Sequence, residues 1–183
     1  MSWQTRSNTA LGTMSGCPEF FSTVSGTHCP CPHLSTAPPR RLFLDREVVE
    51  QKLESLRRCL QRIAAKCPAN AALLITDFDL QDIVSLNLSR AVQLCVDIGA
   101  HLIAGMAIAP PDSMGQTFDR LEQAGVIQQE LALNLKKALG FRNMAVHNYA
   151  AIDWRIVHDI AKNHLDAFSE FAKAIALTLN DAP

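Results

Sequence analysis

The sequence has almost no net charge, since 17 Lys and Arg residues stand against 18 Asp and Glu residues, a formal charge of −1 at pH 7. This balance excludes a protein that coats nucleic acid through bulk positive charge, although it leaves room for a local basic cleft. Convincing strand patterns are also lacking along the chain. Any polyanionic partner must therefore bind at a local site.

Signals for membranes and export are lacking too. The apolar run 92–109 carries Asp97 and His101 in its middle, which the core of a bilayer would penalise, and the N-terminus has no basic stretch followed by an apolar block. We therefore expect a soluble, cytoplasmic protein that contacts no membrane. Half of the six cysteines lie in segments with helical periodicity, where they are expected to be buried reduced thiols: Cys59, Cys67 and Cys95.

Length and composition together indicate one folded domain and one extension. A chain of 183 residues can bury one core. Residues 1–43 are rich in Ser, Thr, Pro and Gly without any sustained period, and are predicted to be a disordered or non-native extension before a helical domain at 44–183. The string "HCPCPH" at 28–33 offers zinc ligands, but a Cys-x-Cys pair between prolines is poorly spaced for chelation, so no metal is predicted.

From Leu44 onward the apolar residues recur at steps of three and four, which is typical of amphipathic helices. The expected helices cover 45–67, about 77–106, 115–124, 128–139 and about 153–175. Gly140 is expected to end the fourth of these in a left-handed conformation. The predicted fold class is all-α, an antiparallel bundle of about five helices.

The stretch "FRNMAVHNY" at 141–149 holds the candidate site. The planar guanidinium of Arg142 suits a phosphate, and a histidine such as His147 can move protons near neutral pH, so the pair could cleave a phosphodiester without metal. On an ideal helix the two would lie about 140° apart. They can converge only if the chain bends, which Gly140 would permit, or if a second copy supplies the opposite wall. Asn143 lies four residues before His147 and could orient its ring.

A polar stripe crosses the otherwise apolar second helix, and its members are Arg90, Gln93, Asp97 and His101. Two interpretations stay open. The stripe is either a solvated edge, or a set of groups that orients the Arg142 cleft or forms a dimer seam.

The spacing of Arg142, His147 and Tyr149 resembles the R-x-x-x-x-H-x-Y signature of HepT toxins, a branch of the HEPN superfamily of small all-helical ribonucleases. The similarity extends to "LDREVVEQKLESLRRCLQRI", to "FDLQDIVSLNLSRAVQLCVDIGAHLI" with Asp97 at the family's acidic position, and to "GFRNMAVHNYAAIDWRIVHDI". It covers the chain from about Leu44, where family members usually begin, so nothing transfers to residues 1–43.

This resemblance implies a type VII toxin, a metal-independent endoribonuclease that works as a two-fold homodimer without a cofactor. His147 would be the general base or acid, Arg142 would bind the scissile phosphate, and Asn143 and Asp97 would support them. Tyr149 would receive AMP from an MNT-type nucleotidyltransferase antitoxin, which silences the toxin. Two alternatives remain, a non-catalytic nucleotide-binding or regulatory subunit of such a nucleotidyltransferase, and a purely structural dimer contact.

Overall fold

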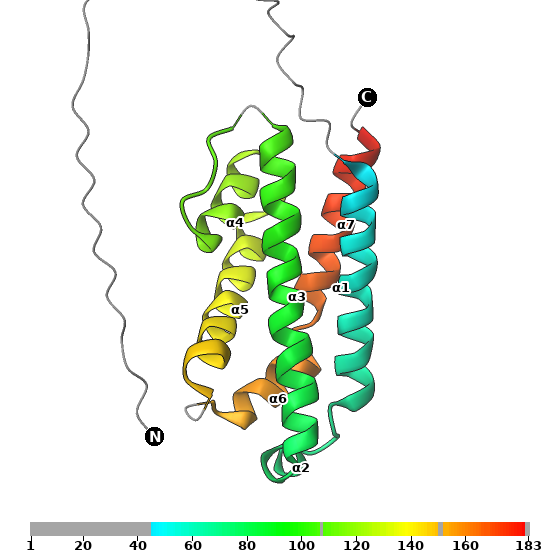
Figure 1. The fold of residues 1–183 in the computed structure, drawn as a ribbon, viewed down its shortest axis with the longest axis vertical. Helices are drawn as coiled ribbons and strands as arrows, with labels where there is room; N and C mark the ends of the chain where they lie inside the picture. Colours follow the sequence, from blue (N-terminus) through cyan, green and yellow to red (C-terminus); the bar gives the residue numbers. More distant parts are fainter. Residues whose placement is uncertain (1–44, 107, 150–151, 182–183) are drawn as a thin grey trace, which may run out of the picture. The chain divides into compact units, whose positions relative to one another are not determined.

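The computed structural model describes residues 45–106, 108–149 and 152–181, which form seven α-helices and no strand. In chain order these are α1 (Arg46–Lys66), α2 (Ala71–Thr76), α3 (Phe78–Gly105), α4 (Met114–Gln123), α5 (Gln129–His147), α6 (Trp154–Asn163) and α7 (Asp166–Asp181). The predicted all-α bundle is confirmed, with more helices than expected (Figure 1). The extension at 1–43 and its HCPCPH string lie outside the described residues.

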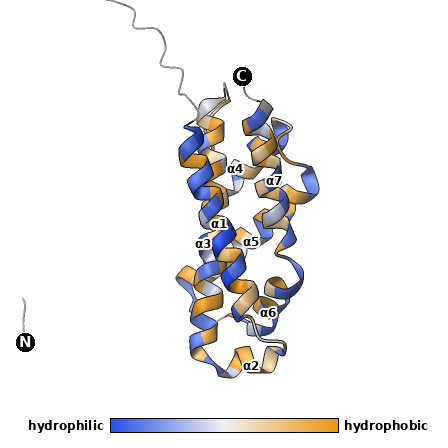
Figure 2. Cartoon of the chain, turned by 90° about the vertical axis from the view of Figure 1, so that its right-hand side faces the viewer, coloured by the Kyte–Doolittle hydropathy of each residue, from blue (hydrophilic) through white to orange (hydrophobic). Residues whose placement is uncertain are grey.

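The longest helices, α1 and α3, run antiparallel and side by side, and α5 and α7 complete the bundle around them (Figure 1). Each long helix carries hydrophobic residues on one side and hydrophilic residues on the other (Figure 2). The largest fully buried side chains come from six of the helices: Leu56, Ile63, Leu74, Leu88, Ile98, Leu102, Ile103, Phe118, Leu121, Leu135, Phe168 and Phe171. One core therefore holds the helices together.

Several boundaries follow the capping signals in the sequence. The side chain of Asp45 accepts a hydrogen bond from Val48 N, that of Asp77 from Leu80 N and that of Ser113 from Gln116 N, so each begins its helix as an N-cap. Gly125 follows α4 with a φ of 74°, a left-handed conformation that favours glycine. The helix starts expected near residues 45, 77 and 115 are thereby confirmed.

The predicted end of a helix at Gly140 is wrong. Gly140 lies inside α5, which continues through the signature to His147, and Gly125 carries the one positive φ in the described part of the chain. Phe141 supplies the physical reason, because its side chain is 4% exposed and extends the buried stripe of Leu135 and Leu139 past the glycine. Burial thus outweighs the stop signal.

The single helix expected at about 153–175 is also wrong, because it divides into α6 and α7. Two hydrogen bonds tie α6 to the loop after α1, from Lys162 Nζ to Cys67 O at 3.1 Å and between His158 Nε2 and Pro68 O at 2.9 Å. In contrast, α7 turns away and packs along α1 and α5 (Figure 1). The helix must therefore end between α6 and α7, so that the two segments can pack against different elements.

Sequence periodicity missed α2 because six residues are too few to show a period. Asn70 caps its start, and its last carbonyls at Leu74 and Ile75 accept hydrogen bonds from Gln81 Nε2 at 3.0 and 2.9 Å. Gln81 is 3% exposed, so this short helix is fixed to α3 by a buried amide.

The cysteines of the described helices behave as predicted. Cys59, Cys67 and Cys95 are free and buried, and burial raises the pKa of all three thiols. Of the described helices, α3 is long and apolar enough to cross a membrane, but half of its most apolar stretch is buried by the other helices, as in the core helix of a globular bundle. By itself this composition is weak evidence for a membrane span.

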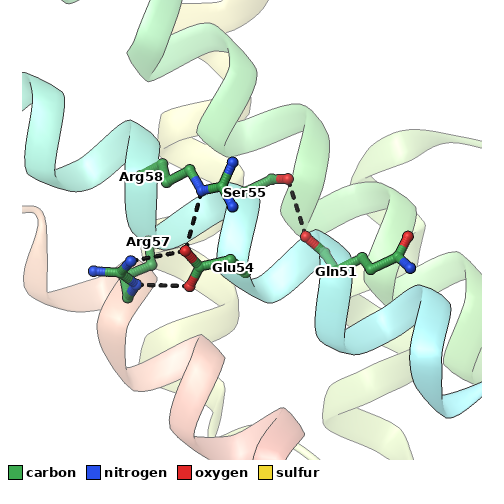
Figure 3. Close-up of polar contacts among 5 residues, drawn as sticks. All are labelled: Gln51, Glu54, Ser55, Arg57 and Arg58. Atoms are coloured by element: carbon green, nitrogen blue, oxygen red, sulfur yellow. Dashed lines mark hydrogen bonds and ion pairs between the residues drawn. The ribbon is translucent and has the colours of Figure 1, made fainter.

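The outer face of α1 shows how the bundle's surface is charged. Glu54 accepts hydrogen bonds from both Arg57 and Arg58 at 2.7 to 3.1 Å, and Ser55 Oγ donates to Gln51 O one turn earlier (Figure 3). The hydrogen bonds from Arg57 and Arg58 lower the pKa of Glu54 to about 2. This face therefore holds its charges in local pairs rather than in a single-sign patch.

Candidate active site at the end of the fifth helix

Arg142 and His147 lie on the last two turns of α5, which is a continuous helix there. An unbroken helix separates side chains five residues apart by about 140°. The bend that Gly140 was expected to provide is absent, so one protomer does not place the guanidinium and the imidazole on the same face. Of the two ways for them to converge, a second copy is the one left.

The Arg142 side chain is half-buried, and its Nη1 donates to Asn143 Oδ1 at 3.5 Å. Across residues 45–106, 108–149 and 152–181, the ion pairs involve other cations and leave this guanidinium without a carboxylate. An arginine that forms no ion pair with an acid of its own chain can use the N–H groups of its planar guanidinium to bind an external anion.

His147 is the last residue of α5, and its ring is exposed. Asn143, one turn earlier and also exposed, accepts from Arg142 instead of orienting His147. The structure therefore brings Asn143 to the guanidinium. Its predicted action on the imidazole would need a rearrangement, which an exposed amide can make.

Tyr149 is held at a site that the sequence did not indicate. Its hydroxyl donates to Asp82 Oδ1 on α3 at 2.9 Å, and its ring meets Trp154 edge to face with the ring centroids 5.4 Å apart. The side chain is still 42% exposed. Burial raises the pKa of Tyr149, and Asp82 raises it further. Asp82 lies 67 residues away in sequence, where no local motif marks it.

Asp97, predicted to support the site, lies elsewhere on α3. Its carboxylate accepts from Lys52 Nζ on α1 at 3.3 Å and from Gln93 Nε2 at 2.8 Å. Fifteen residues of helix separate it from Asp82, roughly 22 Å at 1.5 Å per residue. The structure therefore does not bring Asp97 together with Tyr149 or with the end of α5 in one protomer.

His101, another member of the polar stripe on α3, also contacts the start of α1. His101 Nε2 accepts from Asp45 N at 3.2 Å, where α1 begins, and Gln93 Oε1 is buried without a hydrogen-bond partner in the described residues. The stripe is thus chiefly a polar seam within the protomer. The dimer role considered for it has no support from these contacts.

A groove of about 1280 Å³ runs between α5, α6 and α7 beside the signature. Its lining includes Gly140, Phe141 and Met144 from α5, together with Ile156 and Ile160 from α6. Arg142, His147 and Tyr149 do not line it. The three side chains of the proposed site therefore lie outside this groove, although Met144 between them lines it.

Comparison with known proteins decides the family. Residues 47–175 match the family described as Ribonuclease HepT-like. The chain belongs to this family. The predicted family and enzyme class are thereby confirmed, and the 46 residues before the match lie outside it.

One relative and two solved structures are particularly informative. The mRNA nuclease HepT of Shewanella oneidensis is 35% identical over 129 residues, which are 70% of this chain and 96% of that protein. A solved structure of the tri-AMPylated S. oneidensis HEPN toxin with MNT antitoxin is 34% identical, with a TM-score of 0.68, and covers 72% of this chain and 98% of that one. A toxin–antitoxin complex with AMP-PNP matches with the same identity, coverage and TM-score.

Proposed function

We propose that this protein is an endoribonuclease toxin of a type VII toxin–antitoxin system that acts in the cytoplasm. The observation that carries the proposal is the end of α5, where an arginine without an internal acid and an exposed histidine lie in the family's spacing. The S. oneidensis relative is an mRNA nuclease. We take RNA as the substrate here too.

The two side chains divide the reaction between them. His147 removes the proton from a ribose 2′-hydroxyl, and the oxygen attacks the adjacent phosphorus. The 5′-oxygen leaves and takes up a proton from water, and a cyclic phosphate forms on the other fragment. Arg142 binds the scissile phosphate and stabilises the charge that builds on its oxygens. Because the protein supplies both the general base, His147, and the positive charge of Arg142, the step needs no cofactor. Asn143 holds the guanidinium, as its hydrogen bond suggests.

A two-fold homodimer completes the cleft in this proposal. The straight α5 keeps Arg142 and His147 about 140° apart, so a second copy must supply the facing wall. The same turns carry Met144 and Val146, which are 40% and 56% exposed. Covering these apolar side chains would favour association around the signature.

Silencing acts through Tyr149 and an MNT-type nucleotidyltransferase antitoxin. The support is the tri-AMPylated toxin found with MNT antitoxin in S. oneidensis, together with the position of Tyr149 two residues after His147. Its hydroxyl is at the surface, with 42% of the side chain exposed. Added AMP would bring bulk and negative charge beside the imidazole and keep RNA away.

The experiment is RNA cleavage by purified protein in EDTA, with His147→Ala and Arg142→Ala beside the wild type. Loss of the base is expected to slow cleavage by about 10²- to 10⁴-fold while helicity and sedimentation stay unchanged. A His147→Ala variant that cuts like the wild type contradicts the catalytic assignment. Stoichiometric AMP binding without RNA turnover would instead indicate the non-catalytic regulatory subunit, and dissociation of Arg142→Ala would indicate a structural contact.

A further inference from the structure

Asp82 is a carboxylate outside the signature that contacts the proposed acceptor of AMP, Tyr149. Its Oδ1 accepts the hydrogen bond of the Tyr149 hydroxyl at 2.9 Å, and it reaches that hydroxyl from α3 rather than from the signature itself. A general base must lie within hydrogen-bond reach of the proton it removes, with about 2.6 to 3.2 Å between the two heavy atoms. Asp82 meets this requirement already in the free protein.

The chemistry of the acceptor calls for such a base. Burial and Asp82 both raise the pKa of Tyr149, so the free phenolate is scarce at neutral pH. A neutral phenol is a weak nucleophile unless its proton leaves as the new bond forms. Ser85 also contacts the phenol, but a serine hydroxyl does not take up a proton at neutral pH. The hydroxyl hydrogen is directed to Asp82.

The pair is also accessible to another protein. Asp82 is exposed, and its neighbours one turn away on the same face of α3, Phe78 and Leu86, are 76% and 67% exposed. Nothing within the described helices closes over this face. An active site from a partner can therefore approach the tyrosine hydroxyl and the carboxylate together.

We propose that Asp82 accepts the proton of Tyr149 when this tyrosine is modified by a nucleotidyltransferase. The phenol oxygen attacks the α-phosphorus of ATP, the new O–P bond forms, pyrophosphate leaves, and the phenol proton passes to the carboxylate of Asp82. The inference rests on the proposed modification of Tyr149. It makes this chain supply a group for its own silencing.

The test uses the full-length chain, ATP with magnesium and the S. oneidensis MNT antitoxin, with the S. oneidensis toxin as a positive control. Intact mass over time gives the rate of AMP addition, and peptide mapping gives its position. Asp82→Asn keeps an oxygen that can accept from Tyr149 but loses the base, so the maximal rate should fall by about 10²-fold or more with an unchanged KM for the toxin. Asp82→Glu, which restores a carboxylate, should recover much of the rate.

Asp79→Asn is the matched control, because Asp79 is an exposed acid one turn earlier on α3, and it should be modified like the wild type. Circular dichroism confirms that each variant is folded. If Asp82→Asn is modified as fast as the wild type, Asp82 is only a tether and the inference fails alone. If the wild-type chain gains no AMP on Tyr149 while the positive control does, both the inference and the proposed silencing fail.

Discussion

The two ends of α3 carry acidic side chains with opposite surroundings. Asp97 lies where α3 packs along α1, and its carboxylate is occupied by Lys52 and Gln93. Asp82 lies near the other end, exposed, and its one recorded side-chain partner among the described residues is the hydroxyl of Tyr149. The first carboxylate serves the fold, whereas the second is available for chemistry. The role of a polar residue in an apolar helix thus depends on the residues that pack against it.

The largest effect is expected for Tyr149, which contacts Asp82 near the start of α3. Tyr149→Phe removes the hydroxyl that donates to Asp82, so AMP addition should be abolished completely, while the exposed ring can still pack on Trp154. Intact mass after incubation with the antitoxin and ATP measures this. AMP addition to the phenylalanine variant at the wild-type level would place the acceptor elsewhere.

Near Asp97, in the part of α3 that packs along α1, Gly99→Ala should destabilise the fold by about 2 kcal/mol. The new Cβ would lie 2.6 Å from Thr117 Cγ2 and 3.0 Å from Leu121 Cδ1, where α3 and α4 meet. Overpacking of this kind costs about 1 to 3 kcal/mol, and the better helix propensity of alanine offsets part of it. Urea denaturation gives the value. An unchanged midpoint would mean that α4 moves aside freely.

Asp97→Ala should destabilise by about 1 kcal/mol, because Gln93 Nε2 and Lys52 lose their acceptor in a half-buried seam. Asp82→Ala is the matched comparison, and the free energy of unfolding should change less there because the group is exposed. Thermal unfolding of the two variants side by side measures the difference. Equal losses of stability in the two variants would contradict the different surroundings described for Asp97 and Asp82.

The smallest effect is a gain at the signature end of α5. Gly140→Ala should stabilise the protein by about 0.5 to 1 kcal/mol, since the residue is inside a helix and an added Cβ would meet nothing within 4 Å. A left-handed Gly140, as the sequence suggested, would give a loss instead. The sign of the change in urea midpoint separates the two.

Much of the fold could be predicted because its signals are local. Asp45, Asp77 and Ser113 cap helices through their own side chains, and Gly125 follows one in a left-handed conformation. The failures occur where long-range burial overrides such signals. Phe141 carries α5 past Gly140, and contacts of His158 and Lys162 with the loop after α1 set α6 apart from α7.

For the site, the spacing of Arg142, His147 and Tyr149 indicated the family that the comparison then showed, and it suggested the chemical roles to be tested, because residue types and their order can be read along one segment. Only the tertiary structure decided that α5 stays straight through that segment, that Asp97 belongs to a seam with α1, and that Asp82 meets the tyrosine. The last two are contacts across 45 and 67 residues of chain, which depend on how whole helices pack and which no local sequence pattern reveals.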